Sequence, residues 1–146
     1  MFETGIEGHY ALVDGKKLRF GYTTGTCAAA AAKAAALLLL TGQAPVAVNI
    51  HTPKGIDLRL PIVESKREGD AARCAVRKNS GDDPDVTDGA LVCAQVRVSA
   101  TQGIHIDGGE GVGRATKPGL KVPVVIIKLI YMPNYWTLFM IIIFYF

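Results

Sequence analysis

Residues 28–40 are the most uniform stretch of the chain, and they restrict its fold more than any other part. They contain only alanine, leucine and Lys33, all of which are strong helix formers. Gly42 provides a stop, because glycine readily adopts the left-handed conformation that ends many helices. The small alanine side chains predict a helix that packs closely against its neighbours. We do not expect a membrane span, since the apolar run is shorter than the roughly 20 residues needed and Lys33 interrupts it.

A loop rich in glycine and threonine, residues 21–27, leads directly into this helix. Thr24 or Thr26 can cap the helix start, which leaves free N–H groups directed into the loop. Such a helix end attracts anions through these N–H groups and the helix dipole. An ordinary capped helix without a ligand is the alternative interpretation.

Alternation of apolar and polar residues after Gly42 predicts several strands. The expected strands cover residues 46–50, 58–62, 75–77 and 92–98. The first two flank a turn at residues 52–55 and should form a hairpin, with Pro61 at an edge or a bulge. Residues 64–73 are charged, and we expect them to be solvated.

The stretch of residues 80–89 is the part that is hardest to explain as scaffold. It holds Asp82, Asp83, Asp85 and Asp88 between two glycines, with a proline that favours a shaped turn. Crowded carboxylates repel one another unless a cation, a sulfonium, an arginine or backbone N–H groups lie among them. A solvated acidic turn is the alternative, because Asp, Pro and Gly are common in turns.

A second glycine-rich stretch, residues 107–114, follows the last predicted strand. Glycines let a backbone approach a ligand closely, but the spacing matches a nucleotide-binding loop only loosely. Taken alone, the stretch favours a hairpin loop over a nucleotide site. Arg114, Lys117 and Lys121 could hold carboxylates. Asp107 and Glu110 could face a cation.

The composition excludes several classes of function. A net charge of +3 over 146 residues, without a basic run, argues against nucleic-acid binding. The three cysteines, Cys27, Cys74 and Cys93, are odd in number and widely spaced, which argues against a disulfide framework and a zinc site. The polar N-terminus lacks the apolar core of a signal peptide. A reducing, cytoplasmic setting fits these features.

Four motifs, taken together, resemble the family of cobalt-precorrin-5B C1-methyltransferases, the CbiD family. They are residues 21–33 (GYTTGTCAAAAAK), 52–55 (TPKG), 78–87 (KNSGDDPDVT) and 108–120 (GGEGVGRATKPGL). The resemblance covers residues 18–124 with the motifs in the family's order. It implies an α+β (mixed α/β) fold, in which the alanine-rich helix packs on a mixed sheet and which is CbiD-like rather than that of the Rossmann methyltransferases.

The resemblance also implies a reaction. S-adenosyl-L-methionine would methylate C1 of cobalt-precorrin-5B to give cobalt-precorrin-6A in anaerobic cobalamin biosynthesis. Cobalt would arrive only inside the corrin substrate, so no protein metal site is expected, nor is a nucleic-acid or membrane partner.

Candidate binding residues follow from the three loops, while the resemblance assigns no catalytic residue. They are Thr23, Thr24, Gly25, Thr26, Cys27, Asp82, Asp83, Asp85, Thr87, Gly109, Glu110, Gly111, Gly113, Arg114 and Lys117. We expect the loop of residues 23–27 and the turn of residues 80–87 to face a common cleft. Replacing Asp82 and Asp85 by asparagine is expected to weaken binding and leave the fold intact.

The final part of the chain departs from the family pattern. We expect a CbiD-like N-terminal domain at residues 1–124 and an aberrant apolar tail at residues 125–146, the product of a frameshift or truncation, that packs poorly. Two alternatives stay open. The chain could be an inactive truncated remnant that at most binds a ligand or partner, or a small membrane-anchored protein.

Overall fold

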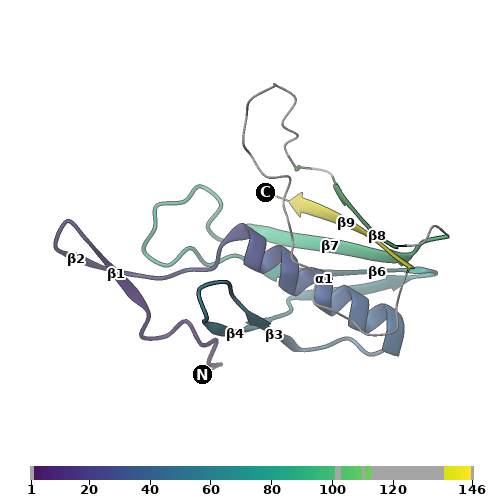
Figure 1. Cartoon of the computed structure of the whole chain (residues 1–146), viewed down its shortest axis with the longest axis horizontal. Coiled ribbons are helices and arrows are strands. Elements are labelled where there is room, and N and C mark those ends of the chain that lie inside the picture. The colour runs from purple at the N-terminus through teal and green to yellow at the C-terminus, as the bar shows by residue number, and fades with distance from the viewer. Residues whose placement is uncertain (1, 101–102, 110, 113–136, 146) are drawn as a thin grey trace.

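The computed structural model describes residues 2–100, 103–109, 111–112 and 137–145 (Figure 1). Within them, the structure has one helix, α1 (Thr24–Thr41), two separate hairpins and one five-stranded sheet. The strands are β1 (Tyr10–Val13), β2 (Lys16–Arg19), β3 (Ala47–His51), β4 (Asp57–Pro61), β5 (Glu64–Glu68), β6 (Ala71–Arg77), β7 (Leu91–Val98), β8 (Gly103–Gly108) and β9 (Thr137–Tyr145). The predicted α+β class is confirmed.

Helix α1 begins earlier than residue 28, and its capping residue differs from both predicted ones. The N-cap is Thr23, whose extended backbone (φ −71°, ψ 154°) lets its side-chain oxygen accept a hydrogen bond from the Thr26 N–H at 3.1 Å. Thr24 and Thr26 are already helical, so neither caps the helix. Gly42 ends the helix as predicted, with a φ of 75° and an N–H that donates to the Leu38 carbonyl.

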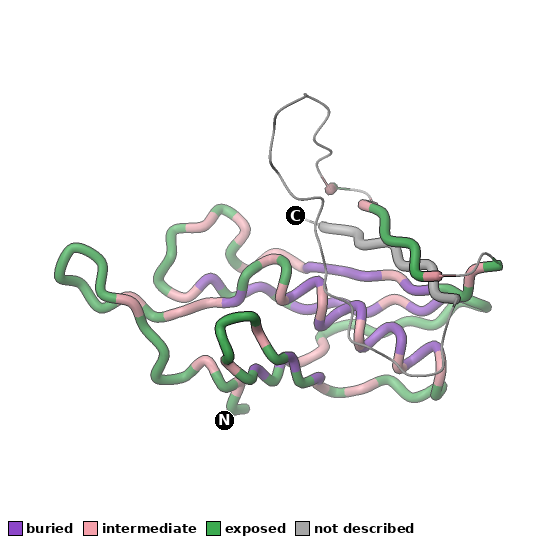
Figure 2. Tube along the Cα trace, viewed as in Figure 1, coloured by how far each residue is buried: buried purple, intermediate pink, exposed green. Residues whose placement is uncertain are grey.

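The core forms where α1 packs against β6, β7 and β3 (Figure 2). Ten side chains of α1 are buried, and most of them are alanines. Their small size allows close packing against equally small residues in the sheet, which include Ala72, Cys74 and Ala94. The buried residues cover a wide part of the helix surface, because α1 packs against both the large sheet and the β3–β4 hairpin.

By length and composition alone, the 18 residues of α1 could cross a membrane, so the length argument does not by itself decide against a span. However, 56% of the helix is buried inside the protein, as in the core helix of a folded domain. Lys33 is also engaged within the fold, because its ammonium donates to the Asn49 carbonyl in β3 at 2.8 Å.

The predicted β3–β4 hairpin is confirmed, and its two strands pair antiparallel. Val48 lies opposite Leu60, and Ile50 lies opposite Leu58; all four side chains are buried. This apolar face closes the core beside α1.

Strand β5 was not predicted, although its residues are exposed as expected. It pairs with β6 at the edge of the large sheet, and both of its faces carry polar or charged side chains. A charged edge strand lacks the alternation of apolar and polar residues by which the other strands were predicted, so the sequence pattern did not reveal β5.

The large sheet has the strand order β5–β6–β7–β9–β8. Strand β9 pairs antiparallel with β7 and parallel with β8, so the sheet is mixed as predicted. Its nine residues lie within the stretch that we expected to be a poorly packed tail, yet their backbone has a paired strand on both sides. The proposed domain boundary at Val124 stays a prediction.

Candidate functional site

Two loops that are far apart in the sequence cross each other next to the start of α1. The Tyr22 N–H donates to the Asn79 carbonyl at 2.7 Å, and the Asp82 N–H donates to the Arg19 carbonyl at 3.2 Å. Glycine is required on both sides of this crossing. A Cβ atom at Gly21 would lie 2.1 Å from the Ser80 carbonyl carbon, and one at Gly81 would lie 2.4 Å from the Arg19 oxygen.

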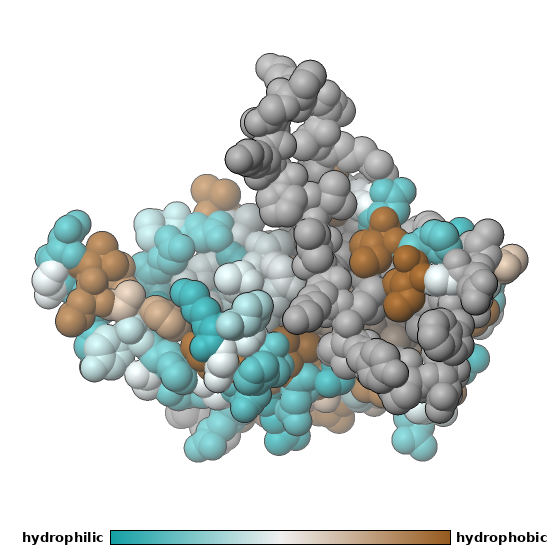
Figure 3. Space-filling view, viewed as in Figure 1, coloured by the Kyte–Doolittle hydropathy of each residue, from teal (hydrophilic) through white to brown (hydrophobic). Residues whose placement is uncertain are grey.

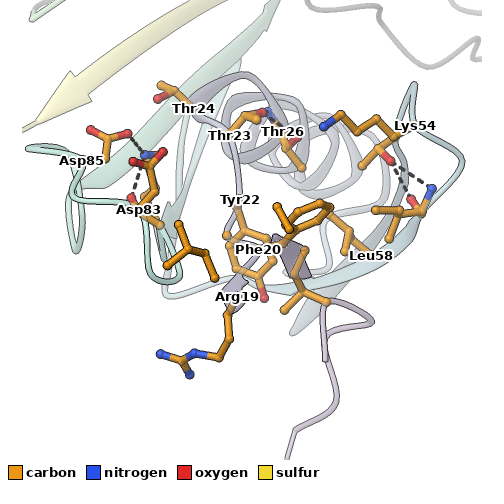
Figure 4. A pocket seen from close by; sticks show the side chains of 18 of the residues that line it. Arg19, Phe20, Tyr22, Thr23, Thr24, Thr26, Lys54, Leu58, Asp83 and Asp85 are labelled. Carbon is orange, nitrogen blue, oxygen red and sulfur yellow. Dashed lines mark hydrogen bonds and ion pairs between the residues drawn. The ribbon is translucent and has the colours of Figure 1, made fainter. Parts of the chain in front are cut away.

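A pocket of about 870 Å³ opens beside this crossing (Figure 4). Its polar wall comes from the start of α1 and from the acidic turn, and its apolar wall comes from the two hairpins and the segment before α1. The polar wall includes Thr23, Thr24, Thr26, Lys78, Ser80, Asp83 and Asp85, and the apolar wall includes Ile6, Ala11, Val13, Leu18, Phe20, Ile56 and Leu58. The two loops that were expected to face one cleft therefore do line one pocket.

The β1–β2 hairpin contributes one of its two faces to the pocket. Ala11 lies opposite Leu18 in the strand register, and both line the pocket together with Val13. The other face carries Tyr10 and Leu12, which are 47% and 73% exposed, respectively. Figure 3 shows apolar surface on this hairpin, which projects from the body of the molecule.

Asp82 is neutralised by Arg19 at the base of this hairpin. The Arg19 guanidinium donates to Asp82 Oδ1 through Nε at 3.0 Å and Nη2 at 2.8 Å, and the Arg19 N–H donates to Oδ2 at 2.8 Å. The guanidinium holds the pKa of Asp82 below its ordinary value. Asp82 is therefore a structural partner of the hairpin.

Asp85 is neutralised by Lys78, which is almost entirely buried. The Lys78 ammonium donates to Asp85 Oδ2, to Ser80 Oγ at 2.9 Å and to Thr87 Oγ1 at 2.8 Å, so all three of its protons have acceptors. Hydrogen bonds from Lys78, then from the Thr87 hydroxyl and N–H, hold the pKa of Asp85 below its ordinary value. The acidic turn is thus folded around the lysine that directly follows β6.

Two charged residues of the pocket lining keep their charges available. Within the described residues, the side chain of Asp83 has no hydrogen bond or ion pair, and neither does the ammonium of Lys54. Lys54 lies in the β3–β4 turn, with its nitrogen 5.3 Å from the centre of the Phe20 ring. Asp88, by contrast, accepts a hydrogen bond from the Ser80 N–H at 2.8 Å.

The predicted site residues therefore divide into three groups. Thr23, Thr24, Thr26, Asp83 and Asp85 line the pocket, whereas Gly25, Cys27, Asp82, Thr87, Gly109 and Gly111 are not part of its described lining. Glu110, Gly113, Arg114 and Lys117 lie outside the described residues.

Cys27 has a different environment from the threonines beside it. Its side chain is fully buried in the core, and this burial raises the pKa of the thiol to about 12. The thiol is therefore protonated at neutral pH and shielded from solvent, which suits a packing role.

Sequence reasoning missed the cations that complete the site. Lys78 immediately precedes the acidic turn, and its spacing from Asp85 could have suggested a local pair. Arg19 is 63 positions away from Asp82, so only the loop crossing reveals that contact. The aromatic contribution of Phe20 and Tyr22 to the pocket was missed for the same reason.

Comparison of the sequence with known proteins identifies its family. The model of the CbiD family matches residues 11–132. A cobalt-precorrin-5B C(1)-methyltransferase from Geobacillus kaustophilus (strain HTA426) is 53% identical over 109 residues, which cover 75% of this chain and 29% of the relative. No solved structure is significantly similar to the chain.

Two further relatives carry the same name. The protein from Thermoanaerobacter sp. (strain X514) is 49% identical over 77% of this chain, and that from Alkaliphilus metalliredigens (strain QYMF) is 49% identical over 79%. The matched parts amount to 31% and 30% of these two relatives, so the chain spans about a third of their length. Since the family model and the relatives match most of its residues, the chain belongs to the CbiD family.

Proposed function

We propose that this chain provides a ligand-binding portion of a cobalt-precorrin-5B C1-methyltransferase. The reaction would transfer a methyl group from S-adenosyl-L-methionine to C1 of the cobalt corrin, in the cytoplasm, as a step of anaerobic cobalamin biosynthesis. The observation that carries the proposal is the pocket at the loop crossing, because it is formed by the motifs at residues 21–33, 52–55 and 78–87. The names of the relatives supply the reaction.

The pocket lining suits a small ligand that has both an apolar and a polar part. The apolar wall suits a flat ring system, while the polar wall carries hydroxyl groups and the carboxylates of Asp83 and Asp85. Its volume of about 870 Å³ is within the usual range of small-molecule sites, roughly 300–1,000 Å³.

The protein's contribution to methyl transfer would be alignment. When bound, the donor supplies a methyl group from its sulfonium. The new carbon–carbon bond forms as the sulfur–methyl bond breaks. The electron pair of the broken bond remains on sulfur, and the donor leaves as S-adenosylhomocysteine. Orientation accounts for much of the rate in such displacements. The Lys78 ammonium holds the acidic turn together through Ser80, Asp85 and Thr87. The crossing at Gly21 and Gly81 joins this turn to the segment that carries Phe20, so the two walls keep a defined spacing.

A chimera tests the proposal directly. Residues 11–132 of this chain, which match the family model, would replace the corresponding segment of the Geobacillus kaustophilus relative. The product would be incubated with cobalt-precorrin-5B and methyl-labelled S-adenosylmethionine. We expect the label to appear in the corrin. A chimera that folds and binds both compounds without transferring the label would instead favour a portion that binds a ligand and does not support catalysis. Loss of both binding and transfer in a folded chimera would refute the proposal.

A further inference from the structure

The charged side chains that line the pocket form two ion pairs and leave one cation and one anion unpaired among the described residues. Five charged side chains line it, namely Arg19, Lys54, Lys78, Asp83 and Asp85. Arg19 is paired with Asp82, and Lys78 is paired with Asp85. One ammonium and one carboxylate, Lys54 and Asp83, stay unpaired within the described residues, so the lining has no net charge once the pairs are counted.

This balance distinguishes between the two reactants of the proposed function. A corrin precursor carries several acetate and propionate groups, and its carboxylates would meet a single free cation together with the repulsion of Asp83. A ligand with one positive region and one negative group matches both unpaired residues. S-adenosylmethionine has a sulfonium and an ammonium at the same end of the molecule as its single carboxylate.

The two residues lie on different elements around the pocket. Asp83 belongs to the acidic turn and Lys54 to the β3–β4 turn, and Figure 4 shows them on opposite sides of the pocket with Phe20 and Tyr22 in the view between them. The apolar wall, which includes Leu18 and Phe20, is available to an aromatic base.

We propose, on the basis of the function proposed above, that this pocket holds the methyl donor, with Asp83 facing its positively charged groups and Lys54 facing its carboxylate. The positive charge on sulfur disappears during transfer, so a carboxylate near it stabilises the bound donor more than the transition state. Asp83 therefore acts in binding, and its removal weakens affinity without slowing the chemical step.

Ligands that lack one charge at a time provide the test. Residues 1–146 would be titrated calorimetrically with S-adenosylmethionine, S-adenosylhomocysteine, decarboxylated S-adenosylmethionine and methylthioadenosine. For Lys54→Gln, we expect about three- to fivefold weaker binding of the two ligands with a carboxylate, because an exposed charge pair contributes little more than this. Affinity for decarboxylated S-adenosylmethionine should not change.

Asp83→Asn should weaken the binding of the three ligands that carry a positive charge, which are S-adenosylmethionine, S-adenosylhomocysteine and decarboxylated S-adenosylmethionine. The affinity for methylthioadenosine should not change. Lys16→Gln and Asp70→Asn remove exposed charges elsewhere and serve as matched controls with no expected effect. Melting curves would verify that every variant is folded. Equal losses for all four ligands, or no loss with either pocket variant, would overturn the assignment.

A further titration separates this inference from the function on which it rests. Cobyrinic acid, a cobalt corrin with free carboxylates, would be offered to the same proteins. If it binds in a manner that depends on Lys54 while no donor analogue binds, the pocket holds the corrin and the present inference fails, but the proposed function stands. If neither class of ligand binds and the chimera is inactive, the proposed function fails as well.

Discussion

Lys78 and Asp85 form an ion pair in which the lysine side chain is only 3% exposed and the aspartate is 33% exposed. The pair closes the acidic turn on itself, because Ser80 and Thr87 share the same ammonium. The crowded carboxylates of this turn predicted a cation, a sulfonium, an arginine or backbone N–H groups among them, and the structure places a lysine of the same segment there. Of the turn's carboxylates in the described pocket lining, that of Asp83 is the one without a hydrogen bond or ion pair.

Replacing Asp85 by asparagine should destabilise the fold, contrary to the expectation from sequence that the turn tolerates this change. The substitution leaves the buried Lys78 ammonium without its counter-charge, which costs more than the loss of an exposed pair. We expect the melting temperature to fall by several degrees, as measured by circular dichroism. Asp83→Asn is the matched control in the same turn and should melt close to the unaltered chain; equal melting of both variants would contradict this account.

Acid should weaken the fold through the same group. The pKa of Asp85 is held below its ordinary value of 3.8, so its contribution is present above pH 3.8 and is lost as the pH falls below it towards the folded-state pKa. The pKa of Asp82 is also lowered, and hydrogen bonds from Thr4 lower the pKa of Glu7 from 4.5 to about 2.

Urea titrations between pH 6 and pH 2 would measure this dependence. The difference in unfolding free energy between the unaltered chain and Asp85→Asn should be constant near neutral pH and shrink below pH 3.8. A difference that persists unchanged at the lowest pH would show that the charge of Asp85 is not the cause.

Alanine at Gly21 should disrupt the loop crossing. A Cβ atom there would lie 2.1 Å from backbone of residue 80, so the crossing must open, at a cost of at least about 1–3 kcal/mol. Gly25 is the matched control, since a Cβ there would lie 3.9 Å from Thr23 Oγ1, which is ordinary van der Waals contact. Gly25→Ala should be neutral or stabilise the helix by up to about 1 kcal/mol. Chemical denaturation of the two variants would compare them.

Removing residues 125–146 tests whether β9 is integral to the sheet. Its pairing with β7 and β8 predicts that a chain ending at Val124 has faster amide hydrogen exchange in β7 and lower stability. Exchange followed by mass spectrometry would compare residues 1–124 with 1–146. A shorter chain that is more soluble, with β7 protected as before, would instead support the aberrant-tail expectation.

The local elements follow from the sequence alone, because each is specified by neighbouring residues. The alanine-rich run forms α1, Gly42 ends it, and the alternation at Val48 and Leu60 gives the buried face of the β3–β4 hairpin. The motifs at residues 21–33 and 78–87 also identified both loops of the pocket, since glycine, proline and aspartate restrict a turn wherever it occurs.

Tertiary structure decided which of the loop charges are free. Arg19 reaches Asp82 only because Gly21 and Gly81 let two distant backbones touch, and no local pattern encodes that approach. The same holds for β9, whose strand partners are β7 and β8. Residue type fixes which side chains carry charge, but the neutralisation of a charge depends on which other group the folded chain brings within hydrogen-bonding distance.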